Sequence, residues 1–462
     1  MAGSRNNRSI DDTVTSVIRS IPNHGPLIDA ARRFLCALPS ELRVGHHVVA
    51  LSGGRDSMAL LYVLAKLRQE HNINLSAVHV HHGLSPNADV WLRRCADICL
   101  ALGIEFSGVR VSVSLDSGEG LEGAARSARY AVFDDVAANA IWLAHHADDQ
   151  AETLLFNLIR GGGVAGASGM PSERRLHRGT ELLRPWLDIP RAVIDAFVLD
   201  SQIDYLDDES NQDTRLSRNF LRHEVMPAIE RRFPDVAVRL AATSRHMAEA
   251  QQLLDDLARM DAVALLQDRR VDLAVLQGLD RRRQKNFLRW WLRTLKARLG
   301  ERALDEWLRQ LGGAASEAEF RELAAGWRFQ VWRSGLHAIP IRDEDRNSKS
   351  FVWRGEPESA WQGGVLRFTR CQGSGLRLPV DGTVVVSLRQ GGERIALGPA
   401  RPRRTVKNLL QEAAVPPWER EAWPLVWVGG VLASVRGVGE AASFCVASDE
   451  AGWQLTWCPL RN

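Results

Sequence analysis

The stretch at 48–65 constrains the fold of this chain more than any other. Four apolar residues, mostly β-favouring, are typical of a buried strand, and Gly53 and Gly54 then turn the backbone without a Cβ clash. A second apolar run predicts a helix with Asp56 or Ser57 as its N-cap. A strand, a glycine turn and a helix N-terminus present free N–H groups and the positive end of the helix dipole to an anion. The stretch therefore predicts a phosphate-binding loop, although a plain turn between strand and helix has the same outline.

The following hundred residues repeat this pattern of strand and helix. Further strands are predicted at 75–80, 104–113 and 140–144, and further helices at 89–102, 119–138 and 148–159. Four such units in series predict an α/β fold with a doubly wound parallel sheet. Ligands bind such sheets at the carboxyl ends of the strands. The glycine loop, the histidines of 79–82 and the polar run 145–149 all fall at those ends.

The rest of the chain has a different sequence pattern, which predicts further domains. Apolar residues at helical spacing in 281–299 indicate a helical domain, whereas strand-like runs after residue 376 flank a short helix at 405–413. Gly429-Gly430 between two of those runs predicts a hairpin turn. We expect a flexible tail (1–25), a catalytic domain (26–233), a helical domain (234–345), a linker (346–375) and a C-terminal α+β domain (376–462).

Composition sets the class of protein but not its function. A chain of 462 residues with 45% hydrophobic and 25% charged residues is ordinary for a globular protein of about three domains. No apolar run reaches the ~18 residues of a membrane span, so we expect no membrane partner. The first residues lack the apolar region of a secretory signal, which predicts a cytoplasmic location. The sequence does not decide between a monomer and a homodimer.

A polar run follows the fourth predicted strand. Asp149 and Glu152 are three positions apart, so they share one helix face and could bind Mg²⁺ or a cationic amine. An acidic first helical turn is also common without any ligand. The histidines at 79–82 and 145–146 have no recognised zinc spacing, so hydrogen bonding or packing against a nucleotide is favoured over metal ligation. Arg126, four residues after Glu122, is typical of a solvated ion pair when taken alone.

Seven motifs occur in a fixed order along the chain. They are S-G-G-x-D-S (52–57), H-V-H-H-G-L (79–84), E-x-x-A-R-x-x-R-Y (122–130), H-H-A-D-D-Q-x-E-T (145–153), R-G-x-G (160–163), D-x-S-N (208–211) and R-N-x-x-R (218–222). The first lacks the ending of a Walker A loop and the third glycine of a dinucleotide fingerprint. It resembles the loop of the PP-loop ATP pyrophosphatases, which cleave ATP between the α and β phosphates. The whole set resembles the bacterial tRNA(Ile)-lysidine synthetases, densely over about 45–230 and loosely beyond.

The resemblance implies a ligase that joins free L-lysine to C2 of the wobble cytidine of tRNA(Ile) with the CAU anticodon. ATP first adenylates the cytidine with release of pyrophosphate, and lysine then displaces AMP. ATP would be bound by Ser52, Gly53, Gly54, Arg55, Asp56, Ser57 and His79. Asp56 would hold Mg²⁺, Asp149 would be the base or the amine anchor, and Glu152 would stand beside it. Arg126 would bind the lysine carboxylate or the AMP phosphate, so Asp56, Asp149 and Arg126 form the expected catalytic set.

Basic residues in the C-terminal half indicate tRNA binding. Between 269 and 302 there are eleven Arg or Lys against three acidic residues, and a second cluster spans 389–407. Two solvated faces would have the same composition. The expected tRNA contacts are Arg218, Asn219, Arg222, Arg281, Arg282, Arg283, Arg401, Arg403 and Arg404.

Two other functions remain open from the sequence. A thiolating tRNA enzyme of the same superfamily would carry paired C-x-x-C motifs, and the six cysteines include no such pair. A non-catalytic RNA-binding protein on the same fold would not need the intact serines and carboxylates of the loop and of the 145–153 motif.

Overall fold

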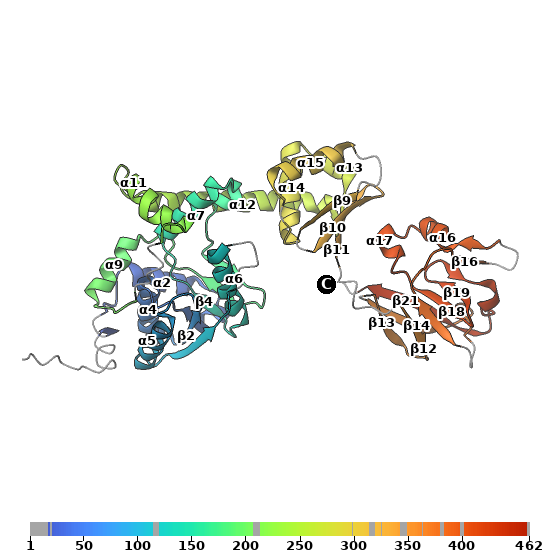
Figure 1. Cartoon of the computed structure of the whole chain (residues 1–462), viewed down its shortest axis with the longest axis horizontal. Coiled ribbons are helices and arrows are strands. Elements are labelled where there is room, and N and C mark those ends of the chain that lie inside the picture. Colours follow the sequence, from blue (N-terminus) through green and yellow to red (C-terminus); the bar gives the residue numbers. More distant parts are fainter. Residues whose placement is uncertain are drawn as a thin grey trace, which may run out of the picture. The chain divides into compact units, whose positions relative to one another are not determined.

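The computed structural model describes residues 17–18, 21–113, 120–206, 213–297, 299–313, 319–324, 326–341, 349–362, 364–378, 383–397 and 402–459. Most of the expected tail, the D-x-S-N motif and Arg401 lie outside these residues. The chain divides into two compact units, Met1–Leu257 and Ala258–Asn462 (Figure 1). The division lies within the helix α12 (Val236–Leu265) and not at the expected boundary after residue 233.

The first unit is built on a six-stranded sheet with the order β3-β2-β1-β4-β6-β5. The strands are β1 (His46–Ala50), β2 (Asn74–His81), β3 (Glu105–Arg110), β4 (Ala140–Trp142), β5 (Glu173–Arg175) and β6 (Glu181–Leu183). All neighbours pair in parallel except β5, which is antiparallel to β6. The predicted parallel sheet is confirmed. The sequence did not indicate β5 and β6, because three residues are too few to display a strand period.

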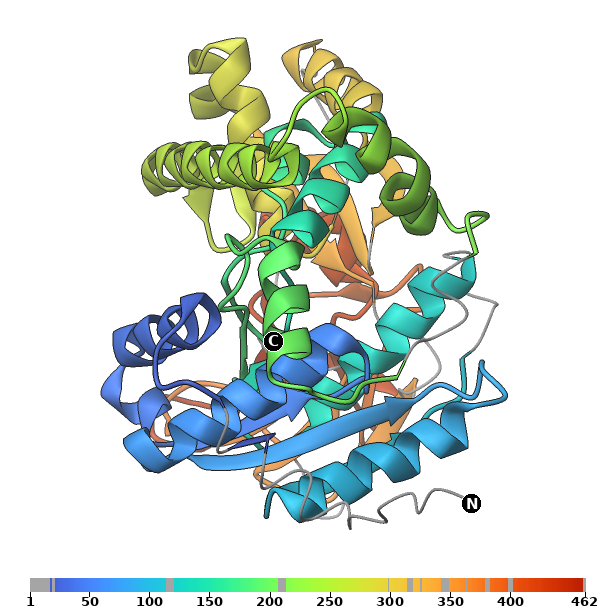
Figure 2. The same ribbon diagram turned by 90° about the vertical axis from the view of Figure 1, so that its left-hand side faces the viewer.

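Helices cover both faces of this sheet (Figure 2). The helices in the described part of the first unit, apart from the shared α12, are α2 (Pro26–Ala37), α3 (Ser40–Arg43), α4 (Arg55–His71), α5 (Ala88–Ala101), α6 (Gly120–Asp135), α7 (Ala147–Ile159), α8 (Gly163–Ala167), α9 (Arg191–Asp200), α10 (Ser217–Phe220), the π-helical η2 (Leu221–Val225) and α11 (Met226–Glu230). Of these, α2, α4, α5, α6 and α9 contribute to the cores on the sheet, whereas α7 and α11 pack against each other and α12. Neighbouring residues of β1 enter different cores, because strand side chains alternate between faces. Val49 packs in the core with α2 and α4, whereas Val48 packs with Phe133 of α6.

The second unit begins with helices and a second sheet. The helices α13 (Leu273–Gly278), α14 (Arg281–Thr294) and α15 (Glu301–Gly313) confirm the helical character predicted for this part. The sheet has the order β7-β8-β11-β10-β9, with β7 (Leu266–Gln267), β8 (Arg270–Asp272), β9 (Glu319–Ala324), β10 (Trp327–Trp332) and β11 (Gly335–Pro340). The sequence analysis did not predict this sheet. Its core joins Trp291 of α14 and Trp307 of α15 to Phe329 of β10.

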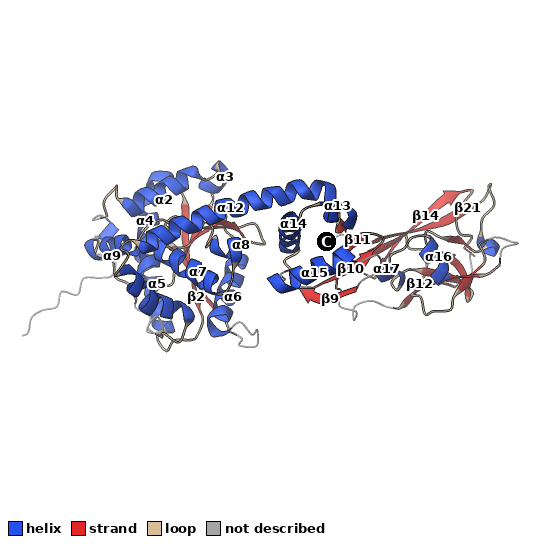
Figure 3. Cartoon of the chain, turned by 90° about the horizontal axis from the view of Figure 1, so that it is seen from above, coloured by secondary structure: helices blue, strands red, loops and turns tan. Residues whose placement is uncertain are grey.

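The C-terminal part consists mainly of β-sheet (Figure 3). Its elements are β12 (Ser350–Trp353), β13 (Glu358–Trp361), β14 (Gly364–Gln372), β15 (Val384–Ser387), β16 (Arg394–Ile395), β17 (Arg404–Thr405), α16 (Val406–Glu412), α17 (Pro417–Arg420), β18 (Leu425–Val428), β19 (Val431–Val435), β20 (Gly439–Glu440), η4 (Ala442–Phe444) and β21 (Ala451–Pro459). The hairpin turn at Gly429-Gly430 is confirmed, since both glycines have positive φ and join β18 to β19.

The expected linker at 346–375 is wrong. β12 pairs with β15, and β14 pairs with β21 along nine residues, so three strands of this segment belong to the C-terminal fold. β12 and β14 have partners far along the chain, and a local pattern cannot reveal such pairing, whereas β13 forms a short hairpin with β14. Among the helices in the described part of the chain, none is both long enough and apolar enough to cross a membrane.

Candidate active site

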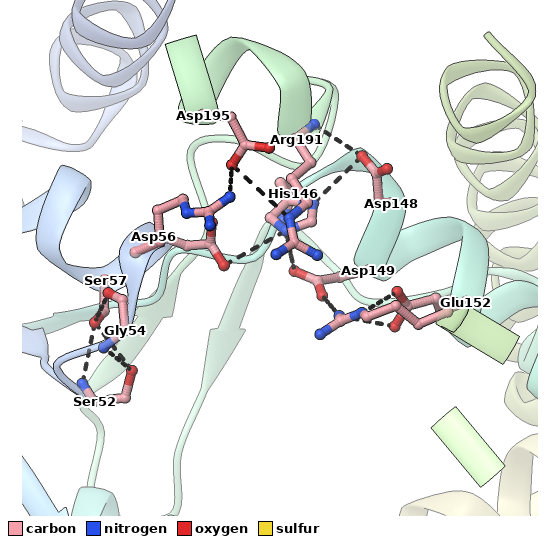
Figure 4. A network of polar contacts seen from close by, with 12 residues as sticks. Ser52, Gly54, Asp56, Ser57, His146, Asp148, Asp149, Glu152, Arg191 and Asp195 are labelled. Carbon is pink, nitrogen blue, oxygen red and sulfur yellow. Dashed lines mark hydrogen bonds and ion pairs between the residues drawn. The ribbon is translucent and has the colours of Figure 1, made fainter. Parts of the chain in front are cut away.

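Hydrogen bonds of serine hydroxyl groups hold the glycine loop between β1 and α4 in its conformation. Ser57 Oγ accepts a hydrogen bond from Ser52 N at 3.2 Å and donates to Gly54 O at 2.9 Å. Figure 4 shows these contacts beside the Ser52 hydroxyl, 3.0 Å from Ser57 Oγ. Gly53 has φ +87°, and a Cβ there would lie 2.8 Å from Leu206 Cδ1. The turn therefore requires glycine at this position, for its backbone and for the close approach of Leu206.

The predicted N-cap of α4 is wrong. Gly54 occupies the N-cap position and has no side chain to make a capping hydrogen bond. Ser57 lies inside the helix, and its hydroxyl donates back to Gly54 O. Asp56 lies in the first helical turn, and its Oδ1 is buried with no hydrogen-bond partner among the described residues. A buried carboxylate oxygen without a donor fits a cation. Within the described residues, no group of three or more His, Cys, Asp or Glu side chains could hold a metal ion.

His146, at the start of α7, lies among three carboxylates (Figure 4). Its side chain is 1% exposed, with Nε2 3.7 Å from Asp56 and 3.4 Å from Asp149, and Nδ1 3.5 Å from Asp148. Burial alone would lower the pKa of His146, but Asp149, Asp148 and Asp56 raise it to about 10. The imidazole is therefore charged near neutral pH and holds carboxylates from two helices together. The sequence analysis had given this histidine only a hydrogen-bonding or packing role.

Arg222 of η2 lies against the carboxylate pair that was predicted on α7. Its Nε donates to Glu152 Oε1 at 2.7 Å, and its Nη2 donates to Glu152 Oε2 at 3.0 Å and to Asp149 Oδ1 at 2.9 Å. Arg222 was expected to bind tRNA, but its guanidinium faces these two acids. The R-N-x-x-R motif was the one signal for this residue, and the motif does not reveal a partner seventy residues away.

Asp149 and Glu152 differ in their acid–base properties although they share Arg222. Burial raises the pKa of Asp149, but the charges of His146 and Arg222 outweigh it, so the pKa lies below its ordinary value. Burial raises the pKa of Glu152 above its ordinary value, and Arg222 only partly opposes this effect. The pair therefore combines a firmly ionised carboxylate with one that accepts a proton more readily.

These groups line one pocket of about 770 Å³. It is bounded by the glycine loop, the exits of β2 and β4, and the helices α6, α7 and η2. The predicted residues along its wall are Ser52, Gly54, Arg55, Asp56, Ser57, His79, Arg126, Asp149, Glu152, Arg218, Asn219 and Arg222. His79 is fixed below the loop, with Nδ1 2.8 Å from Leu51 O. The expected convergence of separate motifs on one edge of the sheet is thus present.

Arg55, in the variable position of the loop motif, points away from the glycine turn. Its guanidinium pairs with Asp195 of α9, donates to Tyr205 Oη at 3.0 Å and lies 4.7 Å from the centre of the Tyr205 ring. Leu206 N also donates to Gly53 O at 2.9 Å. Arg55 therefore fastens the loop to the segment after α9, and this contact adds to its predicted place in the ATP site.

Several of the arginines of the second unit that were predicted to bind tRNA form ion pairs within the protein. Arg283 pairs with Asp261, and Arg281 lies 3.2 Å from Asp305, two acids outside the window that was counted. Arg404 is likewise held by Glu412. Arg282 keeps a side chain that is 95% exposed, 3.7 Å from Asp280. The exposed Arg403 also remains on the surface.

Known families match both ends of the chain. The model of the PP-loop domain matches residues 29–229, and the model of the TilS substrate C-terminal domain matches residues 384–457. The first match contains the glycine loop and the whole pocket. The second covers β15 to β21, apart from the last two residues of β21.

Curated relatives match most of the chain. The tRNA(Ile)-lysidine synthase of Azoarcus sp. (strain BH72) is 40% identical over 421 residues, which are 89% of this chain and 91% of the relative. Those of Nitrosomonas europaea and Coxiella burnetii are 37% and 33% identical and cover 93% of this chain, with 95% and 96% of their own lengths. The motif order, the pocket and these relatives agree, and the chain belongs to the tRNA(Ile)-lysidine synthase family.

Proposed function

We propose that the protein uses ATP to attach free L-lysine to C2 of the wobble cytidine in tRNA(Ile) with the CAU anticodon. One observation carries this function: a phosphate loop, a buried carboxylate without a donor and a pair of carboxylates line the same pocket. A phosphate loop alone fits many nucleotide enzymes. The added pair, Asp149 and Glu152, supplies the negative charge that a cationic amine requires.

The first step is adenylation of the base. The cytidine O2 attacks the α-phosphorus of ATP, and the bond to the β-phosphate oxygen breaks, so that pyrophosphate leaves with the electron pair. The backbone N–H groups of the glycine loop and the N-terminus of α4 stabilise the charge on the departing phosphates. Asp56 would hold Mg²⁺, which would supply positive charge against the phosphates.

The second step joins lysine to the base. The ε-amine attacks C2 and AMP departs, while the amine loses a proton. Asp149 is the better anchor for the incoming ammonium because its pKa is low, and Glu152 is the better proton acceptor because burial raises its pKa. Arg222 holds both carboxylates in place. Arg126 would bind the lysine carboxylate or the AMP phosphate with its two N–H edges.

The tRNA would contact residues around the pocket and on the second unit. Arg218 and Asn219 line the pocket, where they can meet the anticodon loop. Arg281, Arg282, Arg283, Arg403 and Arg404 would contact tRNA phosphates, with Arg282 and Arg403 the most accessible of them. ATP, free lysine and tRNA are all cytoplasmic, which is where we place the reaction.

Thiolation is a weaker alternative for this pocket. Cys95, close to the glycine loop, and Cys99 are buried, and burial raises the pKa of both thiols to about 12. A thiol with that pKa is protonated near neutral pH and is a poor nucleophile.

Transfer of labelled lysine to tRNA tests the proposed function. A tRNA(Ile) transcript with the CAU anticodon should gain lysine in proportion to the AMP and pyrophosphate released. A transcript with uridine at the wobble position is the control and should gain none. ATP cleavage without lysine transfer to either transcript would contradict the function.

A further inference from the structure

Three arginines lie together on the α6 side of the pocket, and two of them, Arg126 and Arg129, line it. We call Arg126, Arg129 and Arg184 the arginine wall. Arg126 Nη2 and Arg184 Nη2 donate to Tyr130 Oη at 3.2 and 3.3 Å. Arg184 directly follows β6, is 2% exposed and also donates from Nη1 to Pro171 O at 2.8 Å. Arg129 lines the pocket, and the charges of Arg126 and Arg184 both act on it.

Among the described residues, no acid compensates the charge of the arginine wall. Within the described stretches, no carboxylate hydrogen-bonds or ion-pairs with any of its three arginines, and the Glu122 side chain lies outside the described part. Arg129 Nε and Arg184 Nε are buried, and the described residues offer neither a hydrogen-bond partner. Burial lowers the pKa of both arginines, and the neighbouring arginines add to this effect although Tyr130 opposes it. Buried guanidinium groups without an anion are costly, so this wall is suited to an anionic ligand.

The histidines on this side of the pocket supply no negative charge. Burial lowers the pKa of His82, and it lowers the pKa of His145 to about 3, so both rings are neutral. Their Nδ1 atoms are also buried without a partner among the residues described. The acidic half of the pocket, around Asp149 and Glu152, is already bound by Arg222 and His146.

We propose that Arg129, supported by Arg126 and Arg184, binds one of the two backbone phosphodiesters that flank the wobble cytidine. The inference rests on the proposed function, because a base that reaches ATP in a pocket leaves its helical stack and brings its own phosphates to the pocket. A phosphodiester matches the two-pronged N–H geometry of a guanidinium. The site would fix the position of the nucleotide, since phosphate contacts position a nucleic acid without reading its sequence.

The other anions of the reaction fit this site less well. The triphosphate of ATP has its own cradle at the glycine loop and the N-terminus of α4. The head group of lysine carries an ammonium beside its carboxylate, so it brings no net negative charge to three arginines that have no acidic partner among the described residues. Arg126 can still contact that carboxylate, and the charge of Arg129 and Arg184 then requires a further anion. A phosphodiester supplies one negative charge with no cation next to it.

The first test replaces Arg129 and follows each substrate separately. Arg129→Met should weaken tRNA binding, measured without ATP or lysine, about 10–100-fold and should reduce its salt dependence by about one ion. The KM values for ATP and for lysine should stay within about twofold. Arg178→Met is the matched control, because Arg178 is exposed and pairs only with Asp135 on the surface among the described residues. It should change none of these values.

The second test removes the charge from the RNA instead. An anticodon stem-loop receives a neutral methylphosphonate on either the 5′ or the 3′ side of the wobble cytidine. One of the two linkages should weaken binding to the wild-type protein about as much as Arg129→Met does. The same linkage should cause no further loss in Arg129→Met, because one contact is then removed from both sides.

Several results would overturn the inference. One is an unchanged tRNA affinity in Arg129→Met, and another is a raised KM for lysine or ATP in place of weaker tRNA binding. The third is that each methylphosphonate weakens binding to Arg129→Met by the same factor as it weakens binding to wild type. If Arg129→Met does not fold, Arg129→Lys replaces it, because lysine keeps the charge but loses the second N–H group. Arg129→Lys should bind the unmodified stem-loop with an affinity between those expected for wild type and Arg129→Met. It should bind the stem-loop with the sensitive methylphosphonate as well as wild type does. If wild-type protein transfers no lysine but shows this coupling, the proposed chemistry fails and the phosphate site stands.

Discussion

At the scale of single residues, the site depends on charges that are buried close together. His146 bridges Asp56 of α4 to Asp148 and Asp149 of α7, and Arg222 adds a second cation to the acidic pair. Sequence patterns identified the acids, because two carboxylates three residues apart share a helix face. They did not identify the cations that hold them. A contact between α7 and η2 depends on the tertiary fold and leaves no local pattern.

Asp56→Asn tests the carboxylate that we assign to Mg²⁺. The amide keeps the shape of the side chain but loses the charge, so turnover should fall about 10²–10³-fold. The melting temperature should fall only moderately, because Asp56 is not the N-cap and its Oδ1 has no hydrogen bond to lose within the described part of the protein, so the main loss is the charge that faces His146 at 3.7 Å. Steady-state kinetics and thermal melting of the same preparation check both points. Near-normal turnover would remove Asp56 from the chemistry.

His146 predicts how stability depends on pH. Its pKa is raised from 6.5 to about 10 in the folded protein, so its contribution is fully present below pH 6.5 and is lost as the pH rises through about 10. Comparing wild type with His146→Gln across this range isolates the effect. The difference in melting temperature should be largest at pH 6 and should shrink towards pH 10. A difference that is constant with pH would show that His146 is neutral.

At the scale of elements, the local sequence predicted the helices, strands and turns that local interactions stabilise. The glycine loop, the first four strands and their helices follow from apolar runs, period and turn residues. The short strands β5 and β6, the sheet from β7 to β11 and the strands within the expected linker were missed. The pairings β8–β11, β12–β15 and β14–β21 span long sequence separations, which composition and period do not record. β5–β6, β7–β8 and β13–β14 pair locally, but at least one strand of each pair has no more than four residues and is too short to display a strand period. The positive charge that residues 269–302 offer to RNA was also overestimated. Asp261 and Asp305 lie outside this range in the sequence but pair with Arg283 and Arg281.

Gly53→Ala tests the geometry of the glycine loop. An alanine at φ +87° costs about 1–2 kcal/mol, and its Cβ would press on the Leu206 side chain. The KM for ATP should rise and the melting temperature should fall. Gly54→Ala is the matched control, because Gly54 has φ −72° and an added Cβ would lie 3.4 Å or more from its neighbours. The prediction fails if the two variants behave alike.

At the scale of the whole molecule, the chemistry and the contacts with the anticodon loop are assigned to the first unit, and further contacts with the body of a large RNA are assigned to the second. The pocket lies entirely in the first unit, whereas Arg282 and Arg403 lie in the second. The model of the TilS substrate C-terminal domain also matches the second unit. A division of this kind predicts that tRNA binding and ATP binding respond separately to changes in the second unit.

Truncation after residue 341 tests this division. The cut lies before β12, because the strands from residue 350 onward pair with the C-terminal fold and would lose their partners in a shorter deletion. The KM for tRNA should rise at least tenfold more than the KM for ATP. If six to ten phosphates are contacted, the affinity of the full chain should fall about 10³–10⁵-fold between 50 and 200 mM salt, with a shallower slope after truncation. Equal changes in both KM values would indicate misfolding of the first unit.

The central claim is that one pocket performs two successive reactions and that Asp149 and Glu152 serve the second. The most direct measurement compares both half-reactions in wild type, Asp149→Asn and Glu152→Gln. Pyrophosphate release with tRNA but without lysine reports adenylation, and labelled lysine on tRNA reports transfer. We predict that transfer falls about 10²-fold or more in both variants while adenylation falls far less. Equal losses in the two half-reactions would contradict this account and would place the carboxylates with the phosphates of ATP.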